Sequence, residues 1–188
     1  MTASTDIAPF NASFGGIDNI VNGSGLSSLS LTATHSQATE FNGWASVTNA
    51  STGNFTFNLN GLYNLAGFSV WNWNNNTNFG INGVNILTST DGSNFTTVTG
   101  APTQFARGVN QAAAAPQQFS FSAVDAAYVR FSVQSNQGSG IGLAEVQFDG
   151  TTAATSVPEP FTIVGTLVGL GSGAALKRRL KAIESKSV

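Results

Sequence analysis

The chain has 188 residues, enough for one domain of ordinary size with a substantial core. It has no cysteine, so disulfide bonds and thiolate zinc sites are excluded. Residues 1–160 hold two basic and eight acidic side chains, which argues against binding to a nucleic-acid backbone, while the other five basic residues lie in residues 161–188.

The first eleven residues carry no helix or strand signal, and we expect a flexible N-terminus there. Seven later segments alternate between apolar and polar residues with a period of two, which is typical of half-buried strands. In NFTFNLN, for example, Phe55, Phe57 and Leu59 fall on one face. The segments are 28–33, 54–60, 66–73, 83–89, 118–122, 127–133 and 143–148.

Turn-forming dipeptides separate these segments, namely Asn-Gly at 60–61 and 82–83 and Asp-Gly at 91–92. We expect no helix before residue 157. Several short strands with one buried face predict an all-β protein, a β-sandwich of the jelly-roll type.

Three patterns occur in order along this domain: STDGSNF at 89–95, AYVRF at 127–131 and GLAEVQF at 142–148. The first pattern suggests the end of a strand, a tight turn and an aromatic residue where the next segment starts. The second suggests a core strand with one charged side chain that points outward. Together with Trp44 in FNGW, they resemble the discoidin-like, coagulation-factor C-type domain and its carbohydrate-binding relatives over about residues 12–150. The resemblance implies a galactose-binding-like jelly roll that binds glycans, lipids or proteins through loops at one end.

The same resemblance implies a structural calcium ion between an early loop and the last strand. By position, its ligands would be the carbonyls of Asn19 and Ala144 and side-chain oxygens of Asn22, Ser24, Ser27 and Glu145. Asn22 replaces the family's usual aspartate, so we expect a dissociation constant on the order of 10⁻⁴–10⁻³ M. The alternative is that Asn22-Gly23 and Ser24-Gly25 are only turn residues.

The stretch WNNNTNF at 73–79 is the candidate ligand-binding loop, because amides hydrogen-bond sugar hydroxyls and an aromatic face stacks on a pyranose ring. The alternative is a solvated turn, since asparagine tolerates left-handed backbone. The single histidine, in THSQATEF, is expected at the surface, with a sugar contact as the other option. The candidate residues are Trp73, Asn74, Asn75, Asn76, Asn78 and His35.

A small polar linker at 151–156 leads to an uncharged run at 161–176. As a helix this run would be about 24 Å long against roughly 30 Å of hydrocarbon, and snorkelling basic residues extend its reach. It is apolar on all sides, which favours a transmembrane helix over a buried terminal helix. The basic residues that follow place the C-terminus in the cytoplasm by the positive-inside rule. They are Lys177, Arg178, Arg179 and Lys181.

The segment before this run is Val157, Pro158, Glu159 and Pro160, whose prolines favour a stiff, extended backbone. The ordered set over residues 157–188 resembles a PEP-CTERM sorting signal. The resemblance implies export, a transient inner-membrane anchor and cleavage by an exosortase in a bacterium that makes exopolysaccharide or biofilm. An ordinary tail anchor is the alternative. Residues 1–13 lack a signal-peptide pattern, so we expect a leader that is encoded upstream or already removed.

Several catalytic patterns are missing from the sequence. It has no thiol, no Ser-His-Asp arrangement with supporting motifs, no phosphate loop, and too little histidine for a catalytic zinc centre. We therefore predict a non-enzymatic protein, exported to the cell surface or extracellular matrix, that recognises polysaccharide or another matrix component. The alternatives are a purely structural biofilm protein without a ligand site and a glycan-active enzyme that uses two carboxylates.

Overall fold

The computed structural model of the chain describes residues 1–14 and 16–153. Residues 1–153 form one compact unit. The predicted sorting motif, apolar run and basic cluster lie outside the described residues. Within residues 1–14 and 16–153, no helix is long and apolar enough to cross a membrane.

The described residues form seven strands and two short 3-10 helices. In chain order they are β1 (Thr2–Thr5), η1 (Ala12–Phe14), η2 (Ile17–Ile20), β2 (Trp44–Ala45), β3 (Gly53–Asn72), β4 (Val84–Ser89), β5 (Thr96–Thr97), β6 (Gln117–Val133) and β7 (Gly142–Thr152).

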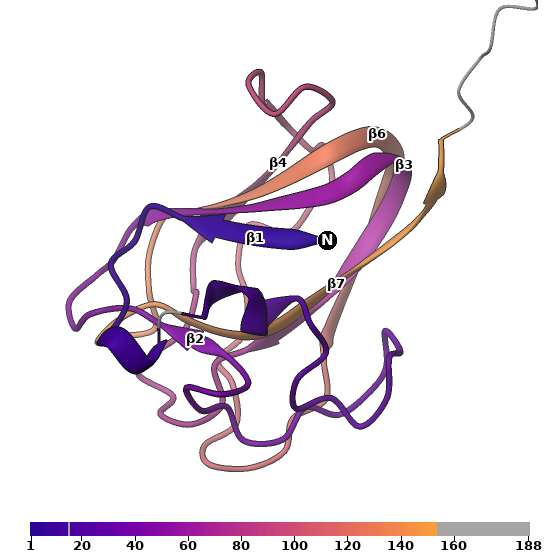
Figure 1. The fold of residues 1–188 in the computed structure, drawn as a ribbon. Helices are drawn as coiled ribbons and strands as arrows, with labels where there is room; N and C mark the ends of the chain where they lie inside the picture. The colour runs from indigo at the N-terminus through magenta and orange to yellow at the C-terminus, as the bar shows by residue number, and fades with distance from the viewer. Residues whose placement is uncertain (15, 154–188) are drawn as a thin grey trace, which may run out of the picture. The chain divides into compact units, whose positions relative to one another are not determined.

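The strands pair antiparallel in the order β2-β7-β3-β6-β4-β5, with β1 also paired to β3. The long strands β3 and β6 bend together, as Figure 1 shows at the upper right. The first half of β3 pairs with β1 and the second half of β6, whereas the second half of β3 pairs with β7 and the first half of β6. One sheet thus folds over into two layers, which confirms the predicted all-β sandwich.

Two pairs of predicted strands are therefore single strands. Segment 54–60 and all but the last residue of segment 66–73 belong to β3, and 118–122 and 127–133 both belong to β6. The predicted turn at Asn60-Gly61 is the bend inside β3, where Asn60 has a φ of 60° and the register shifts between Asn58 and Tyr63. Left-handed backbone at one asparagine bends the strand here instead of ending it.

Phenylalanine rings from both layers meet in the core. The ring centroids of Phe57 and Phe131 lie 5.0 Å apart, and those of Phe68 and Phe131 lie 5.1 Å apart. The alternating faces predicted for 54–60 and 127–133 are confirmed, because Phe55, Phe57 and Val129 are buried. Such aromatic pairs contribute about 0.5–1.5 kcal/mol each beyond their buried area.

The predicted strand at 28–33 is wrong. This segment forms bends and a turn, in which the amide of Ala33 donates to the carbonyl of Ser30 at 3.0 Å. The Ser30 hydroxyl accepts the amide of Thr32 and also bonds the Thr32 hydroxyl, and such local bonding competes with pairing to another strand. The segment instead covers the second layer, where the indole Nε1 of Trp71 donates to the carbonyl of Ala33 at 3.0 Å.

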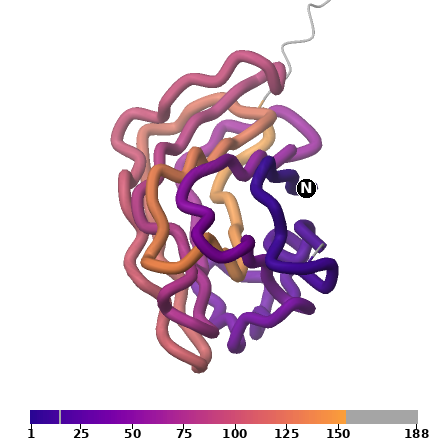
Figure 2. Tube along the Cα trace, turned by 90° about the vertical axis from the view of Figure 1, so that its left-hand side faces the viewer, coloured from indigo at the N-terminus to yellow at the C-terminus, as the bar shows by residue number. Residues whose placement is uncertain are grey.

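The N-terminus also differs from expectation. Residues Thr2–Thr5, expected to be flexible, form β1 beside β3. Figure 2 shows the N-terminal segment (indigo) on the right-hand side of the domain. The Asp91-Gly92 turn is confirmed, since Gly92 has a φ of 76° and the Asp91 carboxylate accepts the amides of Ser93 and Asn94.

Candidate functional site

An aromatic pocket of about 170 Å³ opens where β3 ends and β7 begins. Four rings lie close together there: the centroids of Phe10 and Phe14 are 5.8 Å apart, and those of Phe14 and Trp73 are 6.0 Å apart. Phe79 lies 6.3 Å from Phe10 by the same measure. The residues that line this aromatic pocket are Phe10, Phe14, Ala45, Trp73, Asn75, Asn76 and Phe79.

Backbone contacts hold the pocket in shape. The amide of Phe10 donates to the carbonyl of Ala45 at 2.8 Å, which ties the N-terminal segment to β2. Trp73 packs against Gly142, where a side-chain Cβ would lie 2.8 Å from the Trp73 Cβ and Cγ atoms. The absence of a side chain on β7 thus sets the position of this ring, and the pocket is preformed.

The predicted ligand residues divide into two groups. Trp73, Asn75 and Asn76 line the aromatic pocket. The Asn75 Nδ2 donates to the carbonyl of Ala38 at 2.9 Å, and the Asn76 Oδ1 accepts the amide of Asn78 at 3.0 Å. Each amide keeps further hydrogen-bonding capacity for a ligand.

Asn74 lies outside this site because its side chain is fully buried. Its Oδ1 accepts the amide of Ala38 at 2.8 Å, while its Nδ2 donates to the carbonyls of Ser36 at 3.0 Å and Ala112 at 2.8 Å. Both Nδ2 hydrogens are used by the protein. The structure therefore makes Asn74 a bridge between loops and not a ligand contact.

The Asn78 side chain also connects loops. Its Oδ1 accepts a hydrogen bond from Nη1 of Arg107 at 3.1 Å, and Nη2 of the same guanidinium donates to the carbonyl of Gln137 at 2.7 Å. Arg107 thereby joins three loops at this end of the sandwich. Neither Asn78 nor Arg107 is among the pocket-lining residues.

His35 was expected at the surface, and this is wrong: its exposed fraction is 0%. The Nδ1 atom lies 2.6 Å from the carbonyl of Ser36, and Nε2 has no hydrogen-bond partner. Burial lowers the pKa of His35 below its ordinary value, so the ring is neutral at neutral pH. A fully buried ring offers no surface for a sugar.

Glu145 is a buried carboxylate on β7, with an exposed fraction of 1%. The amide of Gly23 donates to its two oxygens at 3.1 and 3.3 Å, which brings the early loop against the last strand. Burial raises the pKa of Glu145 to about 8, although the bond from Gly23 opposes the shift. The described residues contain no cluster of three or more His, Cys, Asp or Glu side chains.

The other predicted calcium ligands are partly assembled. Asn22 Nδ2 donates to the Oδ1 of Asn19 at 3.3 Å, directly before Gly23, and Ala144 precedes Glu145 on β7. The Asn22 Oδ1 accepts the amide of Ser24 at 2.8 Å. Ser27 is engaged elsewhere, because its hydroxyl accepts the amide of Thr34 at 3.1 Å.

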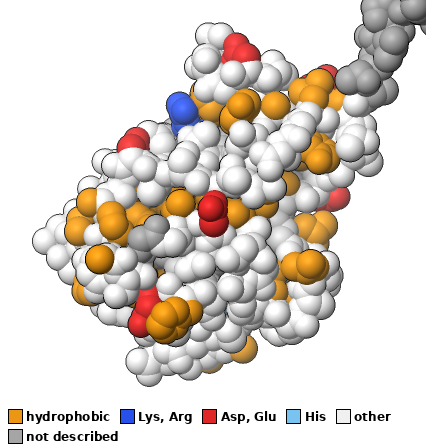
Figure 3. Space-filling model, in the orientation of Figure 1, with side chains coloured by type: hydrophobic (Ala, Val, Ile, Leu, Met, Phe, Trp, Pro, Cys, Tyr) orange, Lys and Arg blue, Asp and Glu red, His pale blue; other side chains and the backbone are white. Residues whose placement is uncertain are grey.

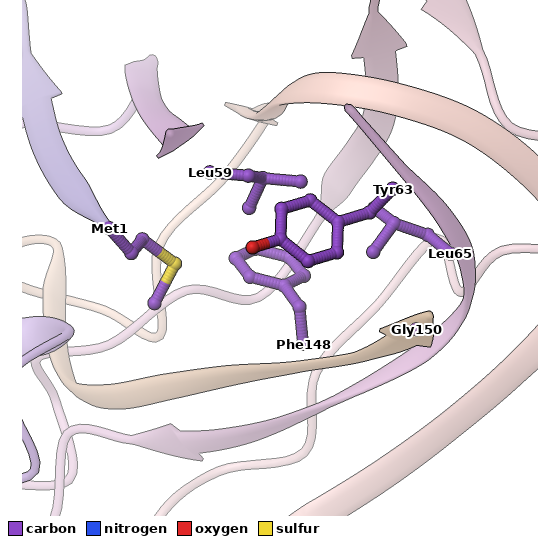
Figure 4. A pocket seen from close by; sticks show the side chains of 6 residues that line it. All are labelled: Met1, Leu59, Tyr63, Leu65, Phe148 and Gly150. Atoms are coloured by element: carbon purple, nitrogen blue, oxygen red, sulfur yellow. The ribbon is translucent and has the colours of Figure 1, made fainter. Parts of the chain in front are cut away.

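A different pocket of about 230 Å³ lies at the opposite end, near the bend of β3. Figure 4 shows the Met1 and Tyr63 side chains extending toward one another across its opening, with Phe148 beneath. Leu59 and Leu65 complete a mainly apolar wall. The Tyr63 hydroxyl is the one polar side-chain group in this lining, so the pocket suits a sugar less well than the aromatic pocket does.

Residues 2–146 match the family described as F5/8 type C domain. The chain belongs to the F5/8 type C family. This confirms the discoidin-like resemblance of the sequence patterns, and the fold of the F5/8 type C domain here is the galactose-binding-like sandwich. No match was found among curated proteins.

Solved structures with the F5/8 type C fold of this chain include CpGH89CBM32-5 from Clostridium perfringens, in complex with GalNAc-beta-1,3-galactose, at 16% identity and a TM-score of 0.53. That match covers 81% of this chain and 94% of the other. A pectin binding carbohydrate binding module matches at 13% identity and a TM-score of 0.55, and the match covers 84% of this chain and 94% of the other. The family 32 CBM from C. perfringens NanJ, in complex with galactose, matches at 14% identity and a TM-score of 0.53, and the match covers 78% of this chain and 91% of the other.

Three aromatic residues of the pocket were missed by the sequence analysis. Phe10 lies in the segment 1–11 that was expected to be flexible, Phe14 lies just after it, and Phe79 was noted only as the end of the asparagine-rich stretch. The spacing of two phenylalanines around a short polar segment was the available signal. Their meeting with Trp73 depends on the long-range contact between the N-terminal segment and β2.

Proposed function

We propose that this protein is a non-catalytic carbohydrate-binding protein whose ligand site is the aromatic pocket. The observation that carries the proposal is the cluster of four rings with Asn75 and Asn76 at its edge. Aromatic rings stack on the apolar face of a pyranose, and side-chain amides bond its hydroxyls. Two of the similar structures described above hold a bound sugar, which supports this choice of ligand.

The lining chemistry favours binding without hydrolysis. None of the seven residues around the aromatic pocket is acidic or basic. Glycoside hydrolysis ordinarily needs two carboxyl groups flanking the bond that breaks. The pocket can therefore hold a neutral sugar, but its lining supplies no general acid or nucleophile.

We expect Phe10→Ala to lower the affinity for an immobilised galactose-containing polysaccharide at least about tenfold, because covering a phenylalanine side chain contributes about 1.5–3 kcal/mol. Phe10 is 47% exposed, so the melting temperature should change little. Tryptophan fluorescence during sugar titration provides a second readout, since Trp73 lines the pocket whereas Trp44 and Trp71 do not. Equal affinity of the variant and the wild type would move the ligand site elsewhere.

A calcium ion is proposed as the structural partner of Glu145. A buried carboxylate requires a cation or a proton to offset its lost hydration, and the described surroundings supply one amide hydrogen bond. The neighbouring oxygens of Asn19, Asn22, Ser24 and Ala144 are the kind that calcium prefers. When bound, the ion would tie the early loop to β7 and keep the loop end of the sandwich ordered.

The routing of the protein is a proposal that rests on residues 157–188. We propose export and exosortase processing at the Pro-Glu-Pro segment, followed by placement at the cell surface or in the extracellular matrix. Replacing Pro158, Glu159 and Pro160 by alanine is expected to leave an uncut precursor in the inner membrane. Immunoblots of fractionated cells measure this directly. The same gel mobility and location for the variant and the wild type would count against sorting.

A further inference from the structure

A polar hollow lies on the outer face of the layer made by β1, the first half of β3 and the second half of β6. Its volume is about 340 Å³, within the range of roughly 300–1,000 Å³ that small-ligand sites occupy. On the face drawn in Figure 3, basic and acidic surface groups lie near one another over these strands. All six residues that line it are polar: Ser4, Thr5, Asp6, Asn54, Thr56 and Arg130.

Arg130 is held in a fixed orientation in this polar hollow. Its Nε donates to the hydroxyl of Thr56 at 3.1 Å, and the guanidinium carbon lies 3.7 Å from the centre of the Phe95 ring. Neither Nη1 nor Nη2 donates to any residue that the structure describes. The second arginine of the domain, Arg107, differs, because both of its terminal nitrogens are used by protein oxygens. Arg130 therefore presents an open fork, the arrangement that binds a carboxylate through two hydrogen bonds.

The other side of the hollow carries hydrogen-bond acceptors. The two carboxylate oxygens of Asp6 accept the backbone amide and the Nδ2 of Asn54, each at 2.7 Å. Although burial favours the neutral form, these bonds and the positive charge of Arg130 hold the pKa of Asp6 below its ordinary value, so the group is ionised at neutral pH. Each oxygen retains lone pairs that can accept from a ligand hydroxyl.

We propose that this polar hollow is a second carbohydrate site and that it takes a uronic acid residue. The ligand's carboxylate would pair with the fork of Arg130, and its ring hydroxyls would donate to Asp6 and bond the nearby serine and threonine hydroxyls. A uronic acid carries its charge on one side of the ring and hydroxyls on the other, which matches the two sides of the hollow. A neutral sugar leaves the fork of Arg130 without an acceptor, and a simple anion leaves the acceptors of Asp6 unused.

This site is separate from the aromatic pocket. The two share no lining residue, and one lies on a sheet face while the other lies at the loop end. The proposal does not depend on the proposed function of the aromatic pocket. A chain with both sites could engage two positions on one polysaccharide, which raises the overall affinity without any new contact.

The test is isothermal titration of the full-length protein with trigalacturonate and with its methyl ester, which has the same shape without the charges. We expect the acid to bind at least about tenfold more tightly than the ester. Arg130→Gln should remove this preference, with a loss of at least about tenfold for the acid. Arg107→Gln removes the same charge from a guanidinium whose fork is already occupied, and it should bind the acid as the wild type does.

Two further variants keep the result interpretable. Arg130→Lys retains the charge without the fork, so an affinity loss in this variant at an unchanged melting temperature supports the site even if Arg130→Gln unfolds. Phe10→Ala disables the aromatic pocket and should bind trigalacturonate normally. The proposal is overturned if the wild type does not bind trigalacturonate, if acid and ester bind equally, if both Arg130 variants keep full affinity, or if Phe10→Ala abolishes binding.

Discussion

The melting temperature is expected to fall as the pH rises from about 6.5 to about 8 when divalent cations are removed, and Glu145→Gln should abolish this fall. Burial raises the pKa of Glu145 to about 8 in the folded protein, against 4.5 for an ordinary glutamate. Between these values the folded state holds a proton that the unfolded state has released. Stability therefore decreases with rising pH, with a slope that approaches about 1.4 kcal/mol per pH unit.

His35 opposes this effect at lower pH. Because its pKa is lowered on folding, the unfolded state binds a proton near pH 6.5 that the folded state does not, and stability rises as the pH increases toward that value. The two slopes therefore oppose each other below about pH 6.5. The uncompensated fall is therefore confined to the range above about 6.5, where Glu145 alone of these two groups titrates.

Calcium should reverse the fall in the wild type. The ion binds the carboxylate and competes with its proton, so excess calcium should raise the melting temperature at pH 8 far more than at pH 5. Thermal melts at both pH values, with chelator or with calcium, measure the effect, and Glu145→Gln is the control. If the wild type and the variant show the same pH profile with chelator, the proposed role of this carboxylate is wrong. If calcium leaves the melting temperature unchanged at pH 8, the proposed calcium site is wrong, but the proposed titration of Glu145 still stands.

The second large effect is expected at Asn72, near the end of β3. Its Nδ2 donates to the carbonyls of Ile81 at 2.7 Å and Ala106 at 2.9 Å, and its Oδ1 accepts the amides of Trp73 and Ile81 at 3.0 Å. All of these groups lie around a side chain that is almost fully buried. Asn72→Ala leaves the amides of Trp73 and Ile81 unpaired, each at about 1–3 kcal/mol, while the two carbonyls keep their bonds from Gln137 and Gln117. With the two lost carbonyl bonds added, the free energy of unfolding should drop by at least about 3 kcal/mol.

Denaturant unfolding measures this drop, and Asn74→Ala should show a comparable one through its three buried bonds. The matched control is Asn110→Ala, an exposed asparagine whose loss should change stability by no more than about 0.5 kcal/mol. Similar stability for all three variants would show that the buried amides do not hold the loops. For Asn74, the measured loss of stability also distinguishes a structural role from the ligand contact that its sequence context suggested.

The prediction of the fold rested on the alternation of apolar and polar residues with a period of two. Phe55, Phe57 and Phe131 lie on the predicted buried faces because side chains alternate strictly along a strand. Strand ends were less predictable. At Asn60-Gly61 the same dipeptide that closes a hairpin bends a continuous strand, and only the pairing with β6 on both sides decides between the two.

The candidate site was predictable only in part, for a similar reason. The stretch 73–79 contains both buried and exposed asparagines, and the sequence does not show which amides meet backbone from the segment at 36–38. Phe10 and Phe14 join the pocket through contacts with residues more than thirty positions away. Local pattern identifies the residue types, while the long-range packing of the N-terminal segment and the loops decides which side chains are free to bind.

Strand β7 spans the domain from end to end, and this has a mechanical consequence. It begins beside the aromatic pocket at Gly142 and ends at Thr152, opposite Tyr63 at the bend. If a polymer grips the pocket while the chain is pulled from its C-terminal side, the tension runs along the strand axis, across hydrogen bonds that lie perpendicular to it. The ladder with β3 is then loaded in shear, so its bonds resist together and do not peel apart one by one.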